Sequence, residues 1–203
     1  MSNKKWRNWH LRTDEDGIIW LHFDKAGSST NVFSSDVFVE FLEILDQLSE
    51  IKSKGLIILS SKESGFIAGA DIEEFTQLKS KEEILELIRV GQSALDKLEA
   101  LPFPTLSLIN GFCLGGGMEM ALACDYRIAM DDPKTRLGLP EVHLGIHPGW
   151  GGTVRMPRLI GAPAAMDLML SGRTVNARTA KIMGIVDRIA PQRHLRRAAK
   201  ILI

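Results

Sequence analysis

The stretch Gly111–Glu119, "GFCLGGGME", puts three consecutive glycines directly before an acidic residue, where an apolar helical pattern begins. Glycine costs backbone entropy and adds nothing to a core, so a glycine run indicates that the backbone must stay bare at this point. The residues leave two interpretations open. The glycines allow a helix to pack closely on a strand, or they leave free amides at a helix N-terminus that can bind an oxyanion.

Two phosphate-binding fingerprints fail at these glycines. A P-loop requires Gly-Lys-Ser/Thr, which does not occur near this stretch. A dinucleotide fingerprint requires GxGxxG, but the last position holds Met120 after Gly115–Gly117 and Val154 after Gly149–Gly151. The oxyanion interpretation therefore has no competitor among the phosphate-binding motifs.

A second loop of small residues lies in "FIAGAD", where Ala68, Gly69 and Ala70 follow a buried strand pattern. The glycine run follows another buried strand pattern. Two such loops can each supply one backbone N–H group, and an oxyanion hole requires two donors.

Two acidic residues lie in apolar surroundings: Glu119 comes two residues after the glycines, and Glu141 lies in "LGLPEVHLG". A carboxyl group among apolar neighbours has a raised pKa, which suits proton transfer near neutral pH. Simpler interpretations also exist, because Glu119 could compensate a helix dipole and Glu141 could be a solvated loop acid. The joint occurrence of two acids and two candidate amide loops favours a site of proton transfer.

Other chemically active side chains give no comparable indication of a functional site. His143 and His147 lack the HExxH order, and Gly145 and Pro148 interrupt a helix between or beside them, so we expect no metal site. Cys113 has no identifiable base partner and is predicted to be a buried structural thiol. The basic segment 193–197, "RHLRR", is typical of a solvated helix face.

Composition places the chain among ordinary globular proteins of one domain, with 203 residues and 45% apolar residues. Lysine and arginine (25) balance aspartate and glutamate (25), so no net basic charge recruits nucleic acid. Cys113 and Cys124 form no disulfide framework, which favours a reducing compartment. Residues 1–17 lack the apolar core of a signal peptide, and no stretch approaches the roughly 18 apolar residues of a membrane span. We expect a cytoplasmic protein without an integral membrane segment.

Hydrophobic periodicity divides the chain into alternating strands and helices, which is typical of an α/β domain. The apolar runs predict strands at 17–25, 55–61, 104–111 and 127–132, with a short element at 185–190 and a loop at 65–71. The helical patterns predict helices at 31–50 with Ser34 or Ser35 as the cap, and at 72–78, 81–101, 118–126, 153–161, 163–172, 176–184 and 191–203.

Four segments together resemble the crotonase (enoyl-CoA hydratase/isomerase) superfamily. They are "FIAGADI" at 66–72, "INGFCLGGGMEMALACDYRIA" at 109–129, "LGLPEVHLGIHPGWGGTVRMPRLIG" at 137–161 and "LSGRTVNARTAKIMGIVD" at 170–187. The match runs in the family's order from about Gly17 to the C-terminus. The loop at 130–141 is similar to that of multifunctional fatty-acid oxidation proteins, whose N-terminal domain is a hydratase.

The resemblance implies an α/β spiral of repeated ββα turns and an enoyl-CoA thioester substrate. It implies that the amides of Ala68 and Gly116 form the oxyanion hole. It also implies that Glu119 is the base for water that adds at C3 and that Glu141 delivers a proton to C2. Further substrate- or CoA-binding positions carried over from the motifs are Phe66, Ala70, Asp71, Ile72, Gly117, Pro140 and Gly149.

The resemblance also carries expectations about the whole protein. Hydration needs no cofactor beyond the coenzyme A of the substrate, and NAD is expected only if dehydrogenase domains follow. The family's domain continues past Ile203 with closing helices, so we expect residues 1–203 to be a hydratase domain within a longer multifunctional chain. Stand-alone relatives form homotrimers, whereas multifunctional relatives pair with a thiolase subunit.

Three alternatives stay open from the sequence. The chain could be an enoyl-CoA isomerase or another crotonase enzyme, or an acyl-CoA-binding fragment without activity. Trp150 departs from the small residue expected at its position, so it either narrows the acyl pocket or packs beside it.

Overall fold

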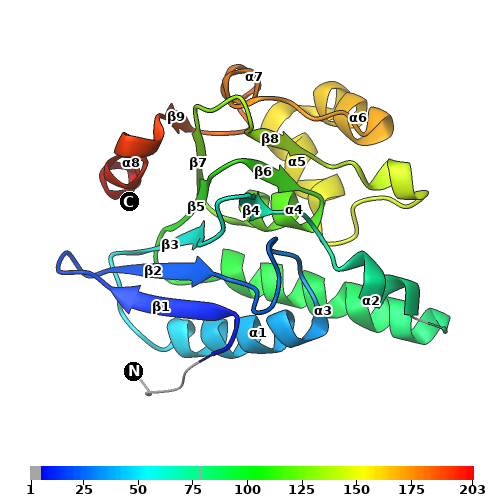
Figure 1. The fold of residues 1–203 in the computed structure, drawn as a ribbon, viewed down its shortest axis with the longest axis horizontal. Helices are drawn as coiled ribbons and strands as arrows, with labels where there is room; N and C mark the ends of the chain where they lie inside the picture. The colour runs from blue at the N-terminus through cyan, green and yellow to red at the C-terminus, as the bar shows by residue number, and fades with distance from the viewer. Residues whose placement is uncertain (1–5, 78) are drawn as a thin grey trace.

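The computed structural model describes residues 6–77 and 79–203, and within them the strands form two sheets (Figure 1). The large sheet has the order β1-β2-β3-β5-β7-β9, and the small sheet has the order β4-β6-β8. All neighbouring strands in named pairs are parallel except β1 and β2. The large-sheet strands are β1 (Trp9–Thr13), β2 (Ile18–Phe23), β3 (Gly55–Ser60), β5 (Thr105–Ile109), β7 (Tyr126–Met130) and β9 (Arg188–Ala190).

The small-sheet strands are β4 (Gly65–Ile67), β6 (Phe112–Leu114) and β8 (Arg136–Gly138). The α-helices are α1 (Ser35–Ser49), α2 (Ile72–Gln77), α3 (Lys81–Glu99), α4 (Gly116–Ala123), α5 (Gly152–Ile160), α6 (Ala162–Ser171), α7 (Ala177–Met183) and α8 (Leu195–Leu202). Two short 3-10 helices are η1 (Glu141–Leu144) and η2 (Gln192–His194). Within the described residues, no helix has the length and apolar character to cross a bilayer.

The chain advances through repeated ββα turns, as the resemblance implied. In each turn, one strand joins the large sheet, the next joins the small sheet, and a helix follows. The units β3-β4 with α2 and α3, β5-β6 with α4, and β7-β8 with η1 and α5 repeat this order. Because every turn crosses from one sheet to the other at the same end, the three crossing segments lie side by side. The α/β spiral predicted from the sequence is confirmed.

Alternation along the large sheet builds two hydrophobic cores, because successive side chains of a strand face opposite sides. In β3, Leu56 and Ile58 belong to the main core with α1, α3 and α4. Ile57 and Leu59 belong to a second cluster that is covered by α8. Figure 1 shows α1 and α3 side by side, with α8 away from them. Strands buried on both faces explain the unbroken apolar runs in the sequence.

Most predicted elements are confirmed, and the differences concern short strands. Ser34 is the N-cap of α1, Ser80 caps α3 through a capping box with Glu83, and α3 ends before Pro102. The loop predicted at 65–71 was wrong in its first part, because residues 65–67 form β4. The strands β1, β6 and β8 were not predicted. Three-residue strands carry no periodic signal, and β1 is an edge strand with few buried residues. The last residue of the predicted helix 72–78 lies outside the described residues.

Asn31 ties together three strand ends where the spiral changes sheets. Its side-chain nitrogen Nδ2 shares its two hydrogens among three acceptors, the carbonyls of Phe23 and Phe66 at 3.0 and 3.2 Å and Ser60 Oγ at 3.0 Å. Its Oδ1 accepts from the backbone amide of Lys25 at 2.9 Å. Asn31 is buried, so these bonds satisfy polar groups that water cannot reach.

We predict that Asn31→Ala lowers the free energy of unfolding by about 2–3 kcal/mol, since it removes the buried side chain that bonds the Phe66 carbonyl and the Lys25 amide. The measurement is urea unfolding followed by circular dichroism. Gln47→Ala, on the exposed side of α1, is the control and should change stability by less than about 0.5 kcal/mol. Equal midpoints for the two variants would contradict the role of Asn31.

Candidate active site

The segments that follow the small-sheet strands bring the predicted site residues together. Residues 68–71 follow β4, the glycine run follows β6, and Pro140 and Glu141 follow β8. The three preceding strands are neighbours in the small sheet, so their carboxyl ends lie at one edge. Functional side chains of α/β proteins gather at such strand ends because loops there are free to vary.

The outer two glycines of the run, Gly115 and Gly117, are required for different structural reasons. Gly115 is the residue before α4 and has φ 52° and ψ −129°, a conformation that favours glycine. A Cβ at Gly115 would also lie 3.4 Å from Glu141 Oε1. At Gly117, a Cβ would lie 2.5 Å from the carbonyl oxygen of Ile67 in β4. Close helix–strand packing therefore explains Gly117, whereas Gly115 lies beside a site carboxylate.

The middle glycine begins α4, and its N–H group has no partner inside the helix. The positive end of the helix dipole is also directed toward this end of α4. Within the described residues, no hydrogen bond is found for the Gly116 amide. Gly116 therefore presents one free donor at the edge where the segments after the small-sheet strands meet.

The second donor predicted from the sequence, the amide of Ala68, is already engaged. It donates to the carbonyl of Asn31 at 2.9 Å. The carbonyl of Gly69 accepts from Phe33 N at 2.8 Å. In a trans peptide the N–H group points opposite to the carbonyl, so the amide of Ala70 faces away from Phe33. This geometry does not support Ala68 as a donor and offers Ala70 in its place.

Gly69 lies where the two amide segments approach each other. It has φ 121°, which a side chain would strain. A Cβ at Gly69 would lie 3.7 Å from Gly116 N and 3.5 Å from the carbonyl oxygen of Leu114. The amides of Ala70 and Gly116 therefore belong to segments in direct contact, as two donors to one oxygen must.

Glu119 is in the first turn of α4 and is 2% exposed. Its Oε1 accepts hydrogen bonds from the backbone amides of Trp150 and Gly152, both at 2.8 Å. Burial raises the pKa of Glu119, while the two amide bonds and the charges of Arg155 and His147 oppose that rise. The carboxyl group is therefore held rigidly in a place where it can exchange a proton.

Glu141 opens η1 after Pro140, and its two carboxylate oxygens are buried. Neither oxygen has a hydrogen-bond partner among the described residues. Burial, with a smaller contribution from the charge of Glu119, raises the pKa of Glu141 to about 7. The interpretation of Glu141 as a solvated loop acid was wrong. An orphaned carboxyl group of this pKa can both give and take a proton near neutrality.

The loop that holds Glu119 is itself braced by Arg155. The guanidinium donates to the carbonyl of Trp150 at 3.0 Å and forms ion pairs with Asp96 at 2.9 Å and Glu99 at 2.7 Å. These acids lie on α3, so Arg155 connects α5, α3 and the loop. Arg155 thereby holds the carbonyl of Trp150, while the amide of the same residue donates to Glu119.

The remaining predicted binding positions are spread around this centre. Asp71 accepts from the amides of Glu73 and Glu74 at the start of α2 and lies 3.3 Å from Lys25 Nζ. Ile72 is 54% exposed, and the Gly149 carbonyl accepts from Gln92 at 2.8 Å. Phe66 is fully buried in the main core, so its side chain offers no surface to a ligand. The prediction that Phe66 contacts substrate is not supported.

The histidines and the cysteine that the sequence left outside the predicted site have defined surroundings. His143 Nε2 lies 3.2 Å from the carbonyl oxygen of Gly172, and His147 Nδ1 lies 3.1 Å from that of Pro148. Cys113 is fully buried, which raises its thiol pKa far above neutrality and disfavours the nucleophilic thiolate. The basic segment 193–197 has its cations exposed on η2 and α8, as predicted.

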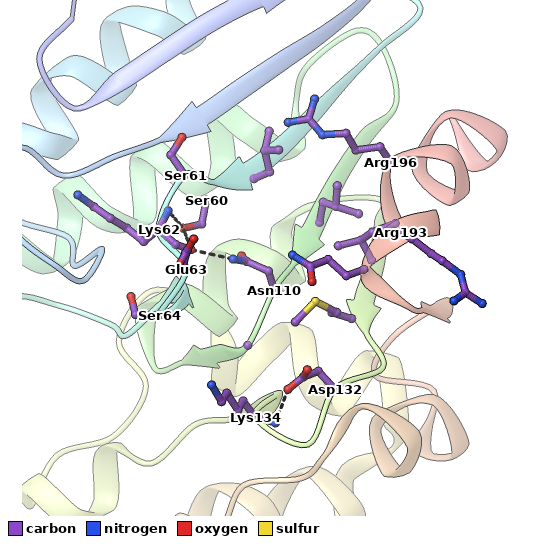
Figure 2. Close-up of a pocket in the computed structure, with 16 residues that line it drawn as sticks. Ser60, Ser61, Lys62, Glu63, Ser64, Asn110, Asp132, Lys134, Arg193 and Arg196 are labelled. Atoms are coloured by element: carbon purple, nitrogen blue, oxygen red, sulfur yellow. Dashed lines mark hydrogen bonds between the residues drawn. The ribbon is translucent and has the colours of Figure 1, made fainter.

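A separate cavity of about 600 Å³ lies beyond the ends of β3, β5 and β7, next to η2 and α8 (Figure 2). It is lined by Asn110, Lys134 and a run of polar residues at 60–64, and by neither Glu119 nor Glu141. Figure 2 shows its cationic side chains pointing in different directions, and Lys62 forms an ion pair with Asp24 at 2.5 Å. Because its charges do not converge, we place the candidate site at the two glutamates.

Two parts of the site were missed from the sequence. The amides of Trp150 and Gly152 hold Glu119, and the available signal was the glycine-rich "HPGWGG" itself. A Cβ at Gly152 would lie 3.1 Å from Glu119 Oε1. The amide of Ala70 was missed because the direction of its N–H group depends on the φ angle of Gly69. A sequence pattern does not give that angle.

Comparison with known proteins identifies the family of the chain. Residues 13–203 match the family model described as enoyl-CoA hydratase/isomerase. The chain is 44% identical, over 201 residues, to the fatty acid oxidation complex subunit alpha of Vibrio vulnificus (strain CMCP6). That alignment covers 98% of this chain and 28% of the relative, so the chain spans little more than a quarter of the relative's length.

Solved structures give the same result for the fold. An enoyl-CoA hydratase from Bacillus anthracis matches with a TM-score of 0.90 and 33% identity, covering 97% of this chain and 75% of that one. One from Geobacillus kaustophilus HTA426 matches with a TM-score of 0.91 and 32% identity, covering 98% and 74%. Fold, site geometry and sequence identity lead to one assignment: the chain belongs to the enoyl-CoA hydratase/isomerase family.

Proposed function

We propose that residues 1–203 form a hydratase domain that adds water across the C2=C3 bond of a trans-2-enoyl-CoA. The observation that carries this proposal is a pair of buried carboxyl groups with raised pKa values, Glu119 and Glu141, beside the free amide of Gly116. Hydration requires a base for water, an acid for carbon and a site for the enolate oxygen. These groups supply all three.

The thioester carbonyl oxygen accepts hydrogen bonds from the amides of Gly116 and Ala70. As negative charge develops on this oxygen, the donors and the dipole of α4 stabilise it without having to reorganise. One such donor typically contributes about 10²–10³ in rate. The contact between Gly69 and the segment before Gly116 supports the pairing of these two amides.

Glu119 takes a proton from the water that adds at C3, and Glu141 gives a proton to C2. The fixed bonds from Trp150 and Gly152 to one oxygen of Glu119 orient the carboxylate toward its water. The pKa of about 7 lets Glu141 carry the proton at neutral pH. For dehydration the two roles reverse. The water oxygen forms a bond to C3 as the C2=C3 π electrons move onto the thioester oxygen, and protonation at C2 restores the carbonyl. No electrons leave the substrate, so the chemistry requires no redox cofactor.

We further propose that this domain works within a longer multifunctional protein. The proposal is supported by 44% identity to part of a protein named as subunit alpha of a fatty acid oxidation complex. In that setting the 3-hydroxyacyl-CoA product passes to an oxidation reaction, and a partner subunit completes the complex.

The proposal predicts that Glu119→Gln and Glu141→Gln each lower kcat for hydration of crotonyl-CoA by about 10²–10⁴-fold, because each removes a proton-transfer group. The measurement follows loss of the enoyl-thioester absorbance. Glu86→Gln, on the exposed side of α3, is the matched control and should keep wild-type turnover. If both site substitutions leave turnover at the wild-type rate, the proposed hydratase mechanism is wrong.

We predict opposite pH profiles for the two directions of the reaction. Hydration needs Glu141 protonated, so its kcat should fall as pH rises through about 7. Dehydration needs Glu141 ionised, so its kcat should rise over the same range. Initial rates with crotonyl-CoA and with 3-hydroxybutyryl-CoA test both. Profiles of equal sign in both directions would exclude Glu141 as the proton donor to C2.

Stability provides a test of Glu141 that needs no turnover. Its pKa is raised from 4.5 to about 7, so between these values the folded chain binds more protons than the unfolded chain. The free energy of unfolding contributed by Glu141 therefore falls as pH rises through this window and levels above it. We predict that Glu141→Gln has a flatter pH dependence of its urea midpoint than wild type. Parallel curves for the two chains would refute the raised pKa.

A further inference from the structure

Trp150 has a backbone role in the site, but its side chain occupies a second and separate position. The indole is 6% exposed and lies between the start of α4 and the middle of α3. A Cβ at Gly116 would lie 2.1 Å from its Cζ3 atom. A Cβ at Gly91 would lie 2.3 Å from its Nε1 atom. The ring therefore fills the whole gap between two glycines, one on each helix.

Gly91 is unexplained without this ring. It lies in the interior of α3, where glycine is among the least favourable residues. Ordinary helix propensity would place alanine there, and the indole leaves no room for a methyl group. Gly91, Trp150 and Gly116 thus form one packing unit. The large indole of Trp150 fits only because both glycines lack a side chain.

The ring cannot retreat deeper into the protein. The edges of Phe33 and Phe38 pack against it at 5.7 and 5.0 Å between ring centroids, with interplanar angles of 88° and 89°. Its backbone is fixed by the bond to Glu119 and by Arg155. The indole is therefore a rigid wall, and anything placed against it must adapt to it.

On the proposed function, this wall lies next to the reacting carbons. Trp150 touches Gly116, which holds the thioester oxygen, and its amide holds Glu119, which acts at C3. The face of α3 that carries Gly91 also carries Ile84 and Ile88, seven and three residues earlier, and both are half-buried. A Cβ at Gly149 would lie 3.8 Å from Ile88. An apolar strip thus leads along α3 and ends at the indole.

We propose that Trp150 is the end wall of the acyl site and determines which acyl chain lengths the domain accepts. The inference rests on the proposed function, because it takes the thioester to lie at Gly116 and Glu119. The indole occupies the space along α3 that carbons beyond C4 would otherwise enter. Trp150 therefore favours short acyl chains, and a smaller residue at this position admits longer ones.

The test compares binding of butyryl-CoA and octanoyl-CoA by isothermal titration calorimetry. These saturated thioesters undergo no hydration, so the measurement does not depend on turnover. Wild type should bind octanoyl-CoA no more tightly than butyryl-CoA. Trp150→Ala should shift the ratio toward octanoyl-CoA by tenfold or more, since each accommodated methylene strengthens binding roughly threefold to fourfold. Trp150→Leu, which keeps an apolar side chain in the core, should shift it in the same direction.

Two controls distinguish an effect of the Trp150 side chain on the acyl site from a general effect of disturbed core packing. Trp20→Phe changes another buried tryptophan, in the cluster under α8, and should keep the wild-type ratio. Gly91→Ala forces the indole toward the site and should weaken butyryl-CoA binding in the wild-type background. In the Trp150→Ala background the same substitution should have no effect, because the ring it displaces is gone.

The outcomes distinguish this inference from the proposed function. If Trp150→Ala and Trp150→Leu keep the wild-type ratio, Trp150 is not the end wall, although binding of both thioesters still supports the acyl-CoA site. An equal effect of Gly91→Ala with and without the indole would also overturn the inference. If wild type and all variants bind neither thioester, the proposed substrate class fails and the inference fails with it.

Discussion

The site depends on one interaction, the capture of the buried Glu119 carboxylate by the amides of Trp150 and Gly152. An isolated buried carboxylate is costly, and hydrogen bonds to backbone amides offset that cost without removing the group's ability to accept a proton. The requirement places a glycine, Gly152, against the Glu119 carboxylate, where a Cβ would lie 3.1 Å from its Oε1. It also places a large residue, Trp150, at the boundary between the reacting centre and α3.

The spiral makes this capture possible because it repeats. Each ββα turn adds a strand to both sheets and sends the segment after its small-sheet strand to the same edge. The segment after β4 brings Ala70, the segment after β6 brings Gly116, and the segment after β8 brings Glu141. Hydrogen bonds such as those of Asn31 fix the distance between consecutive turns. Site geometry is therefore set by sheet register, which tolerates little local variation.

Burial gives the two acids related but different properties. Glu119 is almost fully enclosed and has two amide donors, whereas Glu141 is partly enclosed and its oxygens have no partner among the described residues. Desolvation raises both pKa values, and the charge of Glu119 raises that of Glu141 further. Glu119 is thus fixed by hydrogen bonds, whereas Glu141 has none among the described residues. On the proposed function, this difference in environment lets one glutamate act as the base and the other as the acid.

The sequence by itself determined the α/β class, most helices, the two glutamates and the glycine run, because each leaves a periodic or compositional signal in neighbouring residues. The three-residue strands of the small sheet and the edge strand β1 were missed, since their pairing is non-local. Only the tertiary structure decided that the amide of Ala68 is engaged and that of Ala70 free. It also decided that Trp150 fills the gap between Gly91 and Gly116. Both results depend on backbone direction and on contacts across dozens of residues, which no local pattern encodes.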